Sequence, residues 1–548
     1  MQITFFGAAR TVTPSCYLLE HEGFTFLVDC GLGQGNDDKK SGSGLGFNAG
    51  DIDAVILTHA HIDHSGKLPL LAKKGYRGPV YATSATAELS GILLLDSASI
   101  QESEAEWKSR KNQREGRLPV EPLYNTDDAR AALELFTAVP YKTPCELCEG
   151  LSFTFIDAGH LLGSCSVIIT YSENGTERRL VFSGDIGNTA VPMLKDPETV
   201  TQADYVVMES TYGRRHHKRT GQTEREMLTE RARQLAEITD RTFKRGGNVI
   251  IPAFAVGRAQ EILYLYRMIM NDGLLDYEVP VFLDSPLSIS ATAIYSSVLR
   301  EDYFDEEAKA LIDQGINPIL FPSFSAVREV AASKALNFRT EPCVIIASSG
   351  MCEAGRIRHH LKHNLWREEC TVLFTGYQAE GTLGREILEG AEYVYLFNEE
   401  IAVNAEICTL EGTSGHADQE GLLAWAKAMD KPKQFFITHG DEEDALYFAA
   451  LVEQETGAKA YAPCLKETFV LEEGLEESAS EGQDAEEDRL SDELALLEET
   501  LKAVQQTVAR LAAAADKTER GDIRRSEKLR NAITSFRKEL SSLAEKWK

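Results

Sequence analysis

The sequence predicts an α/β protein of at least two domains, and three observations support this prediction. The chain has 548 residues, too many for one ordinary core, and a hydrophobic fraction of 43% that is normal for a globular protein. Short β-branched and aromatic runs, broken by glycine, fill its first part. In its middle part, apolar runs alternate with helical segments, an order typical of a parallel sheet covered by helices.

The first part of the chain contains six candidate strands, at residues 3–7, 24–29, 54–58, 153–157, 180–183 and 205–208. Several of them end in a polar or ionisable residue at the point where the apolar run stops. Because catalytic groups gather in loops at strand ends, these ends are where a site is expected.

In the middle part the sequence pattern changes to apolar runs that alternate with helical segments, and this part is predicted to be an insertion. Its candidate strands are residues 249–254, 279–284, 344–347 and 371–375, and a helix is expected over 257–271. The chain then returns to a strand at 434–438. We therefore predict a first domain formed by residues 1–211 and 398–471, with an inserted domain at 212–397.

The end of the chain has a different composition. Residues 472–489 form an acidic, Glu/Ser/Gly-rich linker, and apolar residues recur at spacings of four and three through 490–548. This pattern predicts a helical hairpin, or coiled coil. The hairpin is able to fold on itself, to form a homodimer or to dock a partner protein, and the pattern leaves these three roles open.

Composition restricts the environment and the partners. The N-terminus lacks a secretory signal, and the ten scattered cysteines fit reduced thiols, so we expect a cytoplasmic protein. No apolar run is long enough to span a bilayer, so no membrane partner is expected. The net charge of −29 repels nucleic acid, so any RNA contact must be local.

The strongest chemical signal is the motif His59-Ala60-His61-Ile62-Asp63-His64, which directly follows the candidate strand at 54–58. Four potential ligands fall within six residues, and imidazole nitrogen and carboxylate oxygen suit zinc. Packing offers no reason to concentrate so many titratable groups. The motif therefore favours a metal site over a solvated loop.

Three more strand ends carry a potential ligand. The strand at 153–157 leads to His160, the strand at 180–183 leads to Asp185, and the strand at 434–438 leads to His439. Each alone is weak evidence, because a lone histidine is usually structural. Together with the motif they predict one shared site.

These residues resemble the metallo-β-lactamase superfamily and, within it, the β-CASP nucleases such as ribonuclease J and the polyadenylation-cleavage endonuclease. The resemblance extends over roughly residues 1–470 and rests on the positions already named, on segments 252–258 and 348–351, and on Asp29, Glu209 and His416. It implies an αββα sandwich with an inserted β-CASP α/β domain, in addition to the C-terminal helical hairpin.

The resemblance also implies the role of each site residue and two Zn²⁺ ions per chain. One zinc would take His59, His61, His160 and Asp185. The second would take Asp63, His64, Asp185 and His439, so that Asp185 bridges the two ions. Asp29 would orient a ligand imidazole through its free N–H.

The implied reaction is hydrolysis of an RNA phosphodiester bond by a hydroxide that two zinc ions activate. His416 would donate a proton to the leaving oxygen, and Glu209 would orient it. Asp63 is counted with them as catalytic because it would bind the metal at the reacting position.

Two segments are candidates for contacts with single-stranded RNA. Arg214, Arg215, Lys218 and Arg219 form a local positive island in an acidic chain. Ser349 and Gly350 offer backbone N–H groups for a phosphate. A second basic group contains His359, His360, Lys362 and His363.

An endonuclease in RNA processing or decay is the preferred reading, and two alternatives remain. A 5′–3′ exoribonuclease would need a pocket for a terminal phosphate. A small-molecule hydrolase of the same fold would share the metal motif without needing the insertion. In the family, histidine at the last motif goes with RNA rather than DNA, and this chain has His439.

Overall fold

The computed structural model describes residues 1–33, 44–114, 118–217 and 223–471. The predicted linker at 472–489 and the predicted hairpin at 490–548 lie outside the described residues. Contacts divide the chain into one unit, Met1–Gly474, and a second unit, Leu475–Lys548. All described residues belong to the first unit.

The first sheet joins the two ends of the described chain. Its order is β22 (Thr468–Val470), β1 (Gln2–Phe5), β2 (Cys16–His21), β3 (Phe24–Cys30), β4 (Ala54–Ile56), β5 (Val80–Ala82) and β6 (Phe136–Ala138). β1 runs antiparallel to β22, with Gln2 opposite Val470. The strands from β3 to β6 are parallel, so their carboxyl ends, where β4 leads into the histidine motif, lie at one edge.

The second sheet also has seven strands. Its order is β21 (Lys459–Tyr461), β20 (Gln434–Thr438), β11 (Tyr205–Glu209), β10 (Thr176–Phe182), β9 (Cys165–Glu173), β8 (Leu151–Asp157) and β7 (Cys145–Cys148). β10, β11 and β20 are parallel neighbours. Their carboxyl ends therefore deliver Asp185, Glu209 and His439 to the same edge.

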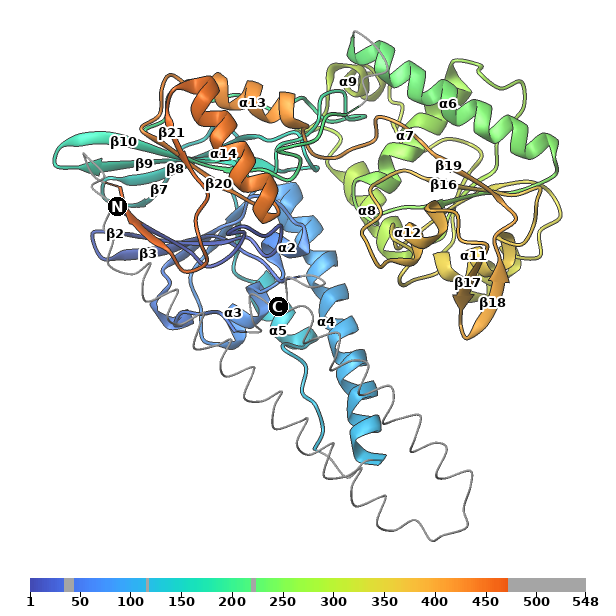
Figure 1. Ribbon diagram of the computed structural model, residues 1–548, viewed down its shortest axis with the longest axis horizontal. Helices are drawn as coiled ribbons and strands as arrows, with labels where there is room; N and C mark the ends of the chain where they lie inside the picture. Colours follow the sequence, from blue (N-terminus) through green and yellow to red (C-terminus); the bar gives the residue numbers. More distant parts are fainter. Residues whose placement is uncertain (34–43, 115–117, 218–222, 472–548) are drawn as a thin grey trace, which may run out of the picture. The chain divides into compact units, whose positions relative to one another are not determined.

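The two sheets pack face to face. Phe5 of the first sheet meets Phe436 of the second with 5.4 Å between ring centroids, and Tyr17 meets Phe182 at 5.3 Å. Helices cover the outer faces: α3 (Leu68–Lys73), α4 (Ser84–Arg114) and α5 (Thr126–Leu133) on the first sheet, α13 (Gln419–Lys427) and α14 (Glu442–Thr456) on the second. Figure 1 shows this αββα order, which confirms the predicted fold class.

A third sheet, of six parallel strands, forms the core of the insertion. Its order is β14 (Phe324–Ala326), β13 (Val281–Leu283), β15 (Val344–Ala347), β12 (Val249–Pro252), β16 (Thr371–Phe374) and β19 (Glu406–Thr409). The central strands are buried on both faces, which explains their continuous apolar runs. β19 pairs with β16, so this sheet takes in a strand that follows residue 397.

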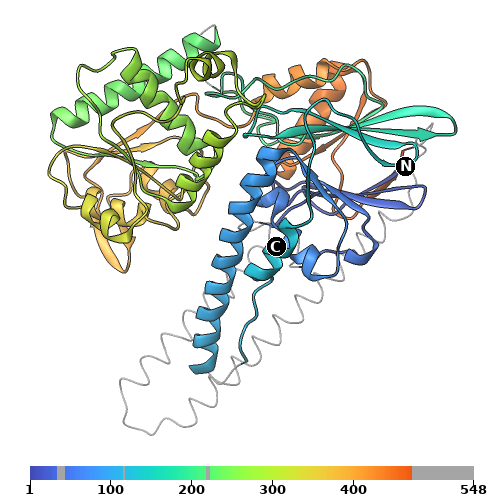
Figure 2. The ribbon, with the colours of Figure 1, turned by 180° about the vertical axis from the view of Figure 1, so that it is seen from behind.

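Helices cover both faces of the third sheet (Figures 1 and 2). One group contains α6 (Glu224–Lys244), α7 (Arg258–Asn271), α8 (Pro286–Ser297) and α9 (Glu306–Asp313). The other contains α10 (Val330–Leu336), α11 (Ile357–Asn364), α12 (Leu383–Leu388) and the hairpin of β17 (Tyr393–Leu396) and β18 (Glu399–Ala402). α7 lies within one residue of the predicted helix at 257–271.

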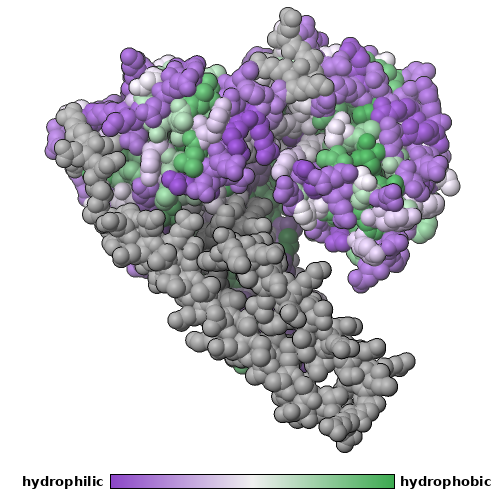
Figure 3. Space-filling model, viewed as in Figure 1, coloured by the Kyte–Doolittle hydropathy of each residue, from purple (hydrophilic) through white to green (hydrophobic). Residues whose placement is uncertain are grey.

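Hydrophilic side chains predominate over the described surface seen in Figure 3, and apolar ones form small patches. None of the helices in the described ranges combines the length and the apolar character that a bilayer-spanning segment needs.

Candidate metal centre and active site

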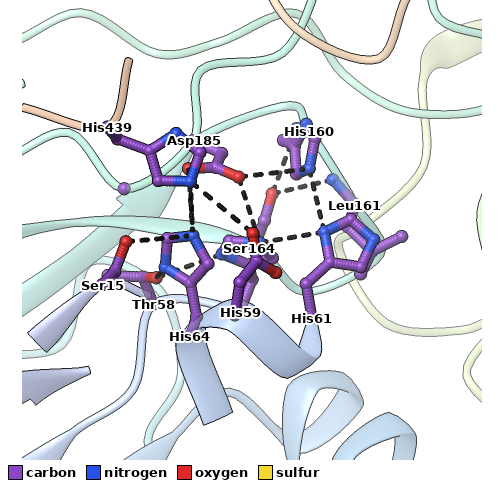
Figure 4. A network of polar contacts seen from close by, with 12 residues as sticks. Ser15, Thr58, His59, His61, His64, His160, Leu161, Ser164, Asp185 and His439 are labelled. Atoms are coloured by element: carbon purple, nitrogen blue, oxygen red, sulfur yellow. Dashed lines mark hydrogen bonds and ion pairs between the residues drawn. The ribbon is translucent and has the colours of Figure 1, made fainter. Parts of the chain in front are cut away.

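The predicted ligands come from four strand ends and one short helix, and the structure brings all of them together (Figure 4). His59 and His61 lie in the loop after β4, and α2 (Ile62–Ser65) carries the next two ligands, Asp63 and His64. His160, Asp185 and His439 follow β8, β10 and β20. The strand-end prediction was therefore a sound guide to where the side chains meet.

The first cluster consists of His59, His61, His160 and Asp185. His61 Nδ1 lies 3.1 Å from His59 Nε2 and 3.2 Å from His160 Nε2. Asp185 Oδ2 lies 3.3 Å from His59 Nε2 and 3.6 Å from His160 Nε2. Four potential donor atoms thus surround one small volume.

The second cluster consists of Asp63, His64 and His439, and Asp185 adjoins it through its other oxygen. His64 Nε2 lies 3.1 Å from His439 Nε2. Asp185 Oδ1 lies 3.3 Å from His64 Nε2 and 3.5 Å from His439 Nε2. The two oxygens of Asp185 therefore face different clusters, an arrangement that suits a carboxylate shared by two cations.

The donor set fits a pair of zinc ions. Nitrogens bound at 2.0–2.1 Å in tetrahedral zinc lie about 3.3 Å apart, close to the spacing observed between these imidazoles. Burial and the neighbouring His59 lower the pKa of His61 to about 3, which favours the neutral, metal-binding ring. Asp185 Oδ1 is buried and has no hydrogen-bond partner among the described residues. A buried carboxylate oxygen without a partner is costly unless a cation faces it.

Most ligand imidazoles are held by a hydrogen bond from the ring nitrogen that faces away from the clusters. The pairs are His59 Nδ1 to Thr58 Oγ1 at 3.1 Å, His64 Nδ1 to Asp29 Oδ2 at 2.7 Å, His160 Nδ1 to the Gly415 carbonyl at 3.1 Å, and His439 Nδ1 to Thr211 Oγ1 at 3.0 Å. Such partners fix the tautomer and the ring orientation and leave Nε2 free to bind a metal.

Asp29 lies beside the imidazole of His64. Besides His64, its carboxylate accepts hydrogen bonds from the Thr58 backbone N–H and the Thr58 hydroxyl, both at 2.8 Å. The neighbouring Gly31 is required by close packing, since a Cβ there would lie 1.7 Å from the backbone oxygen of Asp63. The end of β3 is thus fitted tightly against the ligand-bearing loop.

His416 and Glu209 form a pair beside the first cluster. His416 Nδ1 lies 3.1 Å from both carboxylate oxygens of Glu209, and its ring centroid lies 4.5 Å from that of His160. Burial alone would lower the pKa of His416, but the Glu209 carboxylate outweighs it and raises the pKa to about 9. Asp185, Glu209 and His416 also lie close enough together to form a third potential ligand group. However, Glu209 already accepts the Ile186 N–H at 2.5 Å.

The candidate RNA contacts have different environments. Arg214 pairs with Asp444 and Glu443 of α14, so its charge is balanced within the protein. Arg215 is exposed and lies over the rings of Tyr212 and Tyr377, at 5.7 and 5.4 Å. Lys218 and Arg219 lie outside the described residues.

Ser349 and Gly350 lie in the loop after β15. Ser349 Oγ accepts the Ala354 N–H at 3.2 Å, and Gln378 Nε2 donates to the Gly350 carbonyl at 3.1 Å. A Cβ at Gly350 would lie 3.0 Å from the Phe254 ring. The loop is therefore supported from behind by the β-CASP core, and its role toward RNA stays a prediction.

Apart from Asp29, sequence reasoning missed the residues that hold the ligand imidazoles. Thr58, Thr211 and Gly415 each fix one ligand imidazole. Thr58 directly precedes the histidine motif and Thr211 follows Glu209 by two residues, so adjacency to a motif was the available signal. Nothing in the sequence marks a glycine carbonyl as the partner of a histidine 255 residues away.

Three family models match the chain. They are the metallo-beta-lactamase superfamily over residues 9–230, the Beta-Casp domain over 259–387, and the Zn-dependent metallo-hydrolase RNA specificity domain over 400–463. The third model includes His416 and His439.

Curated relatives agree with these models. The chain is 40% identical to Ribonuclease TTHA0252 of Thermus thermophilus over 452 residues, which cover 82% of this chain and 96% of the relative. It is 31% identical to Transcription termination factor FttA of Methanocaldococcus jannaschii, over 84% of this chain and 70% of the relative. It is 30% identical to an RNase J-like protein of the same organism, over 84% and 97%. With likeness at this level over nearly the whole length of a relative, the chain belongs to the β-CASP nucleases of the metallo-β-lactamase superfamily.

Proposed function

We propose that this protein is a zinc-dependent ribonuclease that hydrolyses internal phosphodiester bonds of single-stranded RNA in RNA processing or decay. The observation that carries the proposal is the pair of adjacent donor clusters that share Asp185, with a general acid candidate, His416, beside them. Two clusters joined by one carboxylate are the arrangement that two-metal phosphodiesterases need.

The ligand assignment follows the two clusters. His59, His61, His160 and Asp185 would hold one zinc ion, and Asp63, His64, His439 and Asp185 the other. When bound, the ions supply a hydroxide at neutral pH and positive charge against the phosphoryl oxygens. The protein's own contribution is rigidity, because the outer hydrogen bonds keep these rings in place.

The leaving oxygen needs a proton, and His416 would donate it. Its Nδ1 is bound by Glu209, so Nε2 is the nitrogen available to a substrate. The carboxylate keeps the imidazolium populated at neutral pH and fixes the direction of its other N–H. Glu209 is a positioning residue, since it acts through His416.

RNA is the substrate class that the surroundings favour. The most similar relatives reported above include proteins named as ribonucleases, and an RNA specificity model matches the segment that supplies His416 and His439. Arg215, exposed beside Tyr212 and Tyr377, offers a cation and two aromatic rings next to the His416 pair. Such a group suits a phosphate and its base.

The test separates catalysis from metal binding. His416→Ala removes the proton donor and no proposed ligand, so the variant should keep two zinc ions per chain by elemental analysis. We expect its turnover on RNA to fall about 10²- to 10⁴-fold, the range for loss of a general acid. Equal loss of zinc and activity would remove His416 from its assigned role.

The mode of cleavage is tested with end-labelled RNA, with and without a 5′-monophosphate. Internal cuts that do not depend on the 5′ end support the endonuclease. Release of mononucleotides only from 5′-phosphorylated RNA would identify a 5′–3′ exoribonuclease instead. No cleavage of either RNA by the zinc-loaded protein would overturn the proposed function.

A further inference from the structure

An exposed group of aromatic and basic side chains lies on the inserted domain, apart from the metal clusters. We call it the α11 patch and define it as Phe338, His359, His363 and Phe397 with the cations Arg358 and Lys334. Phe338 is 77% exposed and Phe397 is 44% exposed. α11 and the β17–β18 hairpin, which contribute most of the patch, are neighbours in both Figures 1 and 2.

The rings of the patch are already arranged for stacking. His359 and Phe397 are nearly parallel, with 4.4 Å between centroids and an interplanar angle of 20°. The guanidinium of Arg358 lies over the same Phe397 ring at 5.3 Å. One turn further along the same face of α11, His363 forms an edge contact with Phe338 at 5.8 Å. Two ring pairs therefore lie along one face of a short helix, and each contains an exposed phenylalanine.

Phe397 stands at a position that does not favour phenylalanine. Leu396 pairs with Glu399, so Phe397 and Asn398 form a two-residue hairpin loop, with φ values of 54° and 63°. Such a turn normally takes asparagine, aspartate or glycine, because a bulky side chain is unfavourable in the left-handed region. A residue that violates its local preference while making an exposed stack points to selection for the ring itself.

The patch is locally positive in an acidic protein. Lys362 is neutralised by Glu399 at 2.6 Å, so we do not count it. Arg358 donates to the Glu353 carbonyl at 3.0 Å but makes no ion pair among the described residues, and Lys334 is exposed. Burial, and then the neighbouring His360, Lys334 and other cations, lowers the pKa of His359. Neighbouring positive charges therefore disfavour protonation of His359.

We propose that the α11 patch is a second RNA-binding site, at which unpaired bases of a long substrate stack on Phe397 and Phe338 while Arg358 and Lys334 bind the adjacent phosphates. The proposal rests on the proposed ribonuclease function. Alternating rings and cations are the chemistry that binds single-stranded nucleic acid without sequence preference, because every base has a stacking face and every linkage a charge.

The fold connects this patch to the catalytic region through packed contacts. A Cβ at Gly257 would lie 3.2 Å from Leu161, the neighbour of His160, and Phe254 of the same loop packs on Gly350. Further along the chain, Arg356 directly precedes α11 and forms an ion pair with Asp284 at 2.6 Å. The inserted domain that carries the α11 patch is thus packed against the residue that follows His160.

A protein partner is the other occupant that exposed rings suggest, and the charges argue against it. The same hairpin offers a second pair of exposed rings, Tyr393 and Tyr395, and there Tyr395 donates to Glu400 at 2.6 Å. Acidic neighbours make that face unfavourable for RNA. The hairpin therefore provides a test site, Phe397, and a matched control, Tyr395.

The decisive variant is Phe397→Asn. Asparagine suits the left-handed turn, so the ring is removed while the hairpin is kept or improved, and the melting temperature should not fall. Tyr395→Thr, which preserves strand propensity, is the control. We compare kcat/KM on single-stranded RNAs of about 25 and about five nucleotides, the shorter being comparable to the smallest sites in single-strand-binding proteins.

The expected result is a difference that depends on length. Phe397→Asn should raise KM for the long RNA about tenfold, the size of one lost base stack, and leave the short RNA and kcat unchanged. Tyr395→Thr should alter neither substrate. In a His416→Ala background, where binding is read by fluorescence anisotropy, Arg358→Gln should reduce the salt dependence of long-RNA affinity by about one phosphate contact.

Each contrary outcome has a distinct meaning. Unchanged long-RNA kinetics and affinity in Phe397→Asn would overturn the proposal. Equal effects on both RNAs would also overturn it, since the ring would then act through the catalytic site. If wild-type protein binds the long RNA through Phe397 and cleaves neither RNA, the proposed function fails while the patch remains.

Discussion

Two buried groups of histidine and aspartate occur in this chain, and they differ in where their polar atoms point. In the metal centre, the nitrogens of His59, His61 and His160 face one another. In the inserted domain, His360 and Asp284 are also fully buried, and every ring nitrogen of His360 faces a partner. Its Nε2 binds Asp284 at 2.6 Å and its Nδ1 faces Asn337 Oδ1 at 2.9 Å.

The Asp284 group is internally complete. The carboxylate accepts from Ser333 at 2.5 Å and from Arg356 at 2.6 Å in addition to His360. Burial raises the pKa of Asp284, but these three hydrogen bonds outweigh it and hold the pKa below its usual value. Nothing in this group requires a ligand, so its role is to join α10 and α11 to the end of β13.

In the metal centre, by contrast, a buried polar atom lacks a hydrogen-bond partner within the described part of the protein. Asp185 Oδ1 makes no hydrogen bond among the described residues, and the cluster-facing imidazole nitrogens converge on one another and on the Asp185 carboxylate. The comparison teaches that burial and residue type do not distinguish a structural cluster from a site. The direction of the unused lone pairs does.

The largest effect is expected from Asp185→Asn, which removes the one carboxylate shared by both clusters. The amide is a poor zinc ligand, so bound zinc should fall below two ions per chain and ribonuclease turnover should be lost. The loss should exceed the roughly 100-fold that a residue supporting a ligand accounts for. Zinc analysis by mass spectrometry and kinetics on the same sample measure both, and full zinc content in an inactive variant would contradict the bridging role.

Asp284→Asn should instead lower the free energy of unfolding without changing zinc binding or catalysis. It leaves Arg356, whose side chain is 18% exposed, without its fully buried counter-ion, and breaking a buried pair costs about 3 kcal/mol as an upper figure here. The expected result is a lower urea midpoint, with zinc content and kcat per folded molecule unchanged. A variant that folds normally but loses zinc would show that the two groups are coupled.

The pH dependence of the same variant checks the electrostatic cause. Because the folded pKa of Asp284 lies below the unfolded value of 3.8, its stabilisation is fully present above that pH and is lost as pH falls through the folded pKa. The stability difference between wild type and Asp284→Asn should therefore be constant from pH 7 to about 5 and shrink below pH 4. A constant difference across the whole range would mean that the loss comes from packing instead.

Much of this comparison was accessible from the sequence. The ligands His59, His61 and His64 stand in one motif, and the other strand-end ligands were found because polar residues interrupt apolar runs. The fold class followed from the alternation of strands and helices and from the family resemblance. These signals are local, which is why a single sequence reveals them.

The rest depends on neighbours that only the folded chain brings together. His360 was grouped with His359 and His363 as a basic patch, but its side of α11 faces the core and binds Asp284. Arg214 was counted in the positive island as a candidate RNA contact, but Asp444 of α14, 230 residues further along the chain, pairs with it. The spacing of residues along the chain predicts which side chains share a helix face. It does not predict which distant carboxylate will contact that face.

The smallest effect is expected from Asp29→Asn, which sharpens the comparison most because the contact resembles the one at Asp284. Asp29 Oδ2 lies 2.7 Å from His64 Nδ1, and Asp284 Oδ2 lies 2.6 Å from His360 Nε2. The same change at both places removes one carboxylate charge beside one buried imidazole. Only His64 has its second nitrogen turned toward another ligand, His439.

Asp29→Asn should therefore weaken zinc affinity about 10- to 100-fold, because the neutral amide orients the His64 ring less firmly and makes it less basic. Competition with a chelator of known affinity measures this, and activity should return at high zinc concentration. Asp284→Asn is the matched control and should keep wild-type zinc affinity while losing stability. If both variants weakened zinc equally, the direction of the second nitrogen would not be what separates a site from a structural cluster.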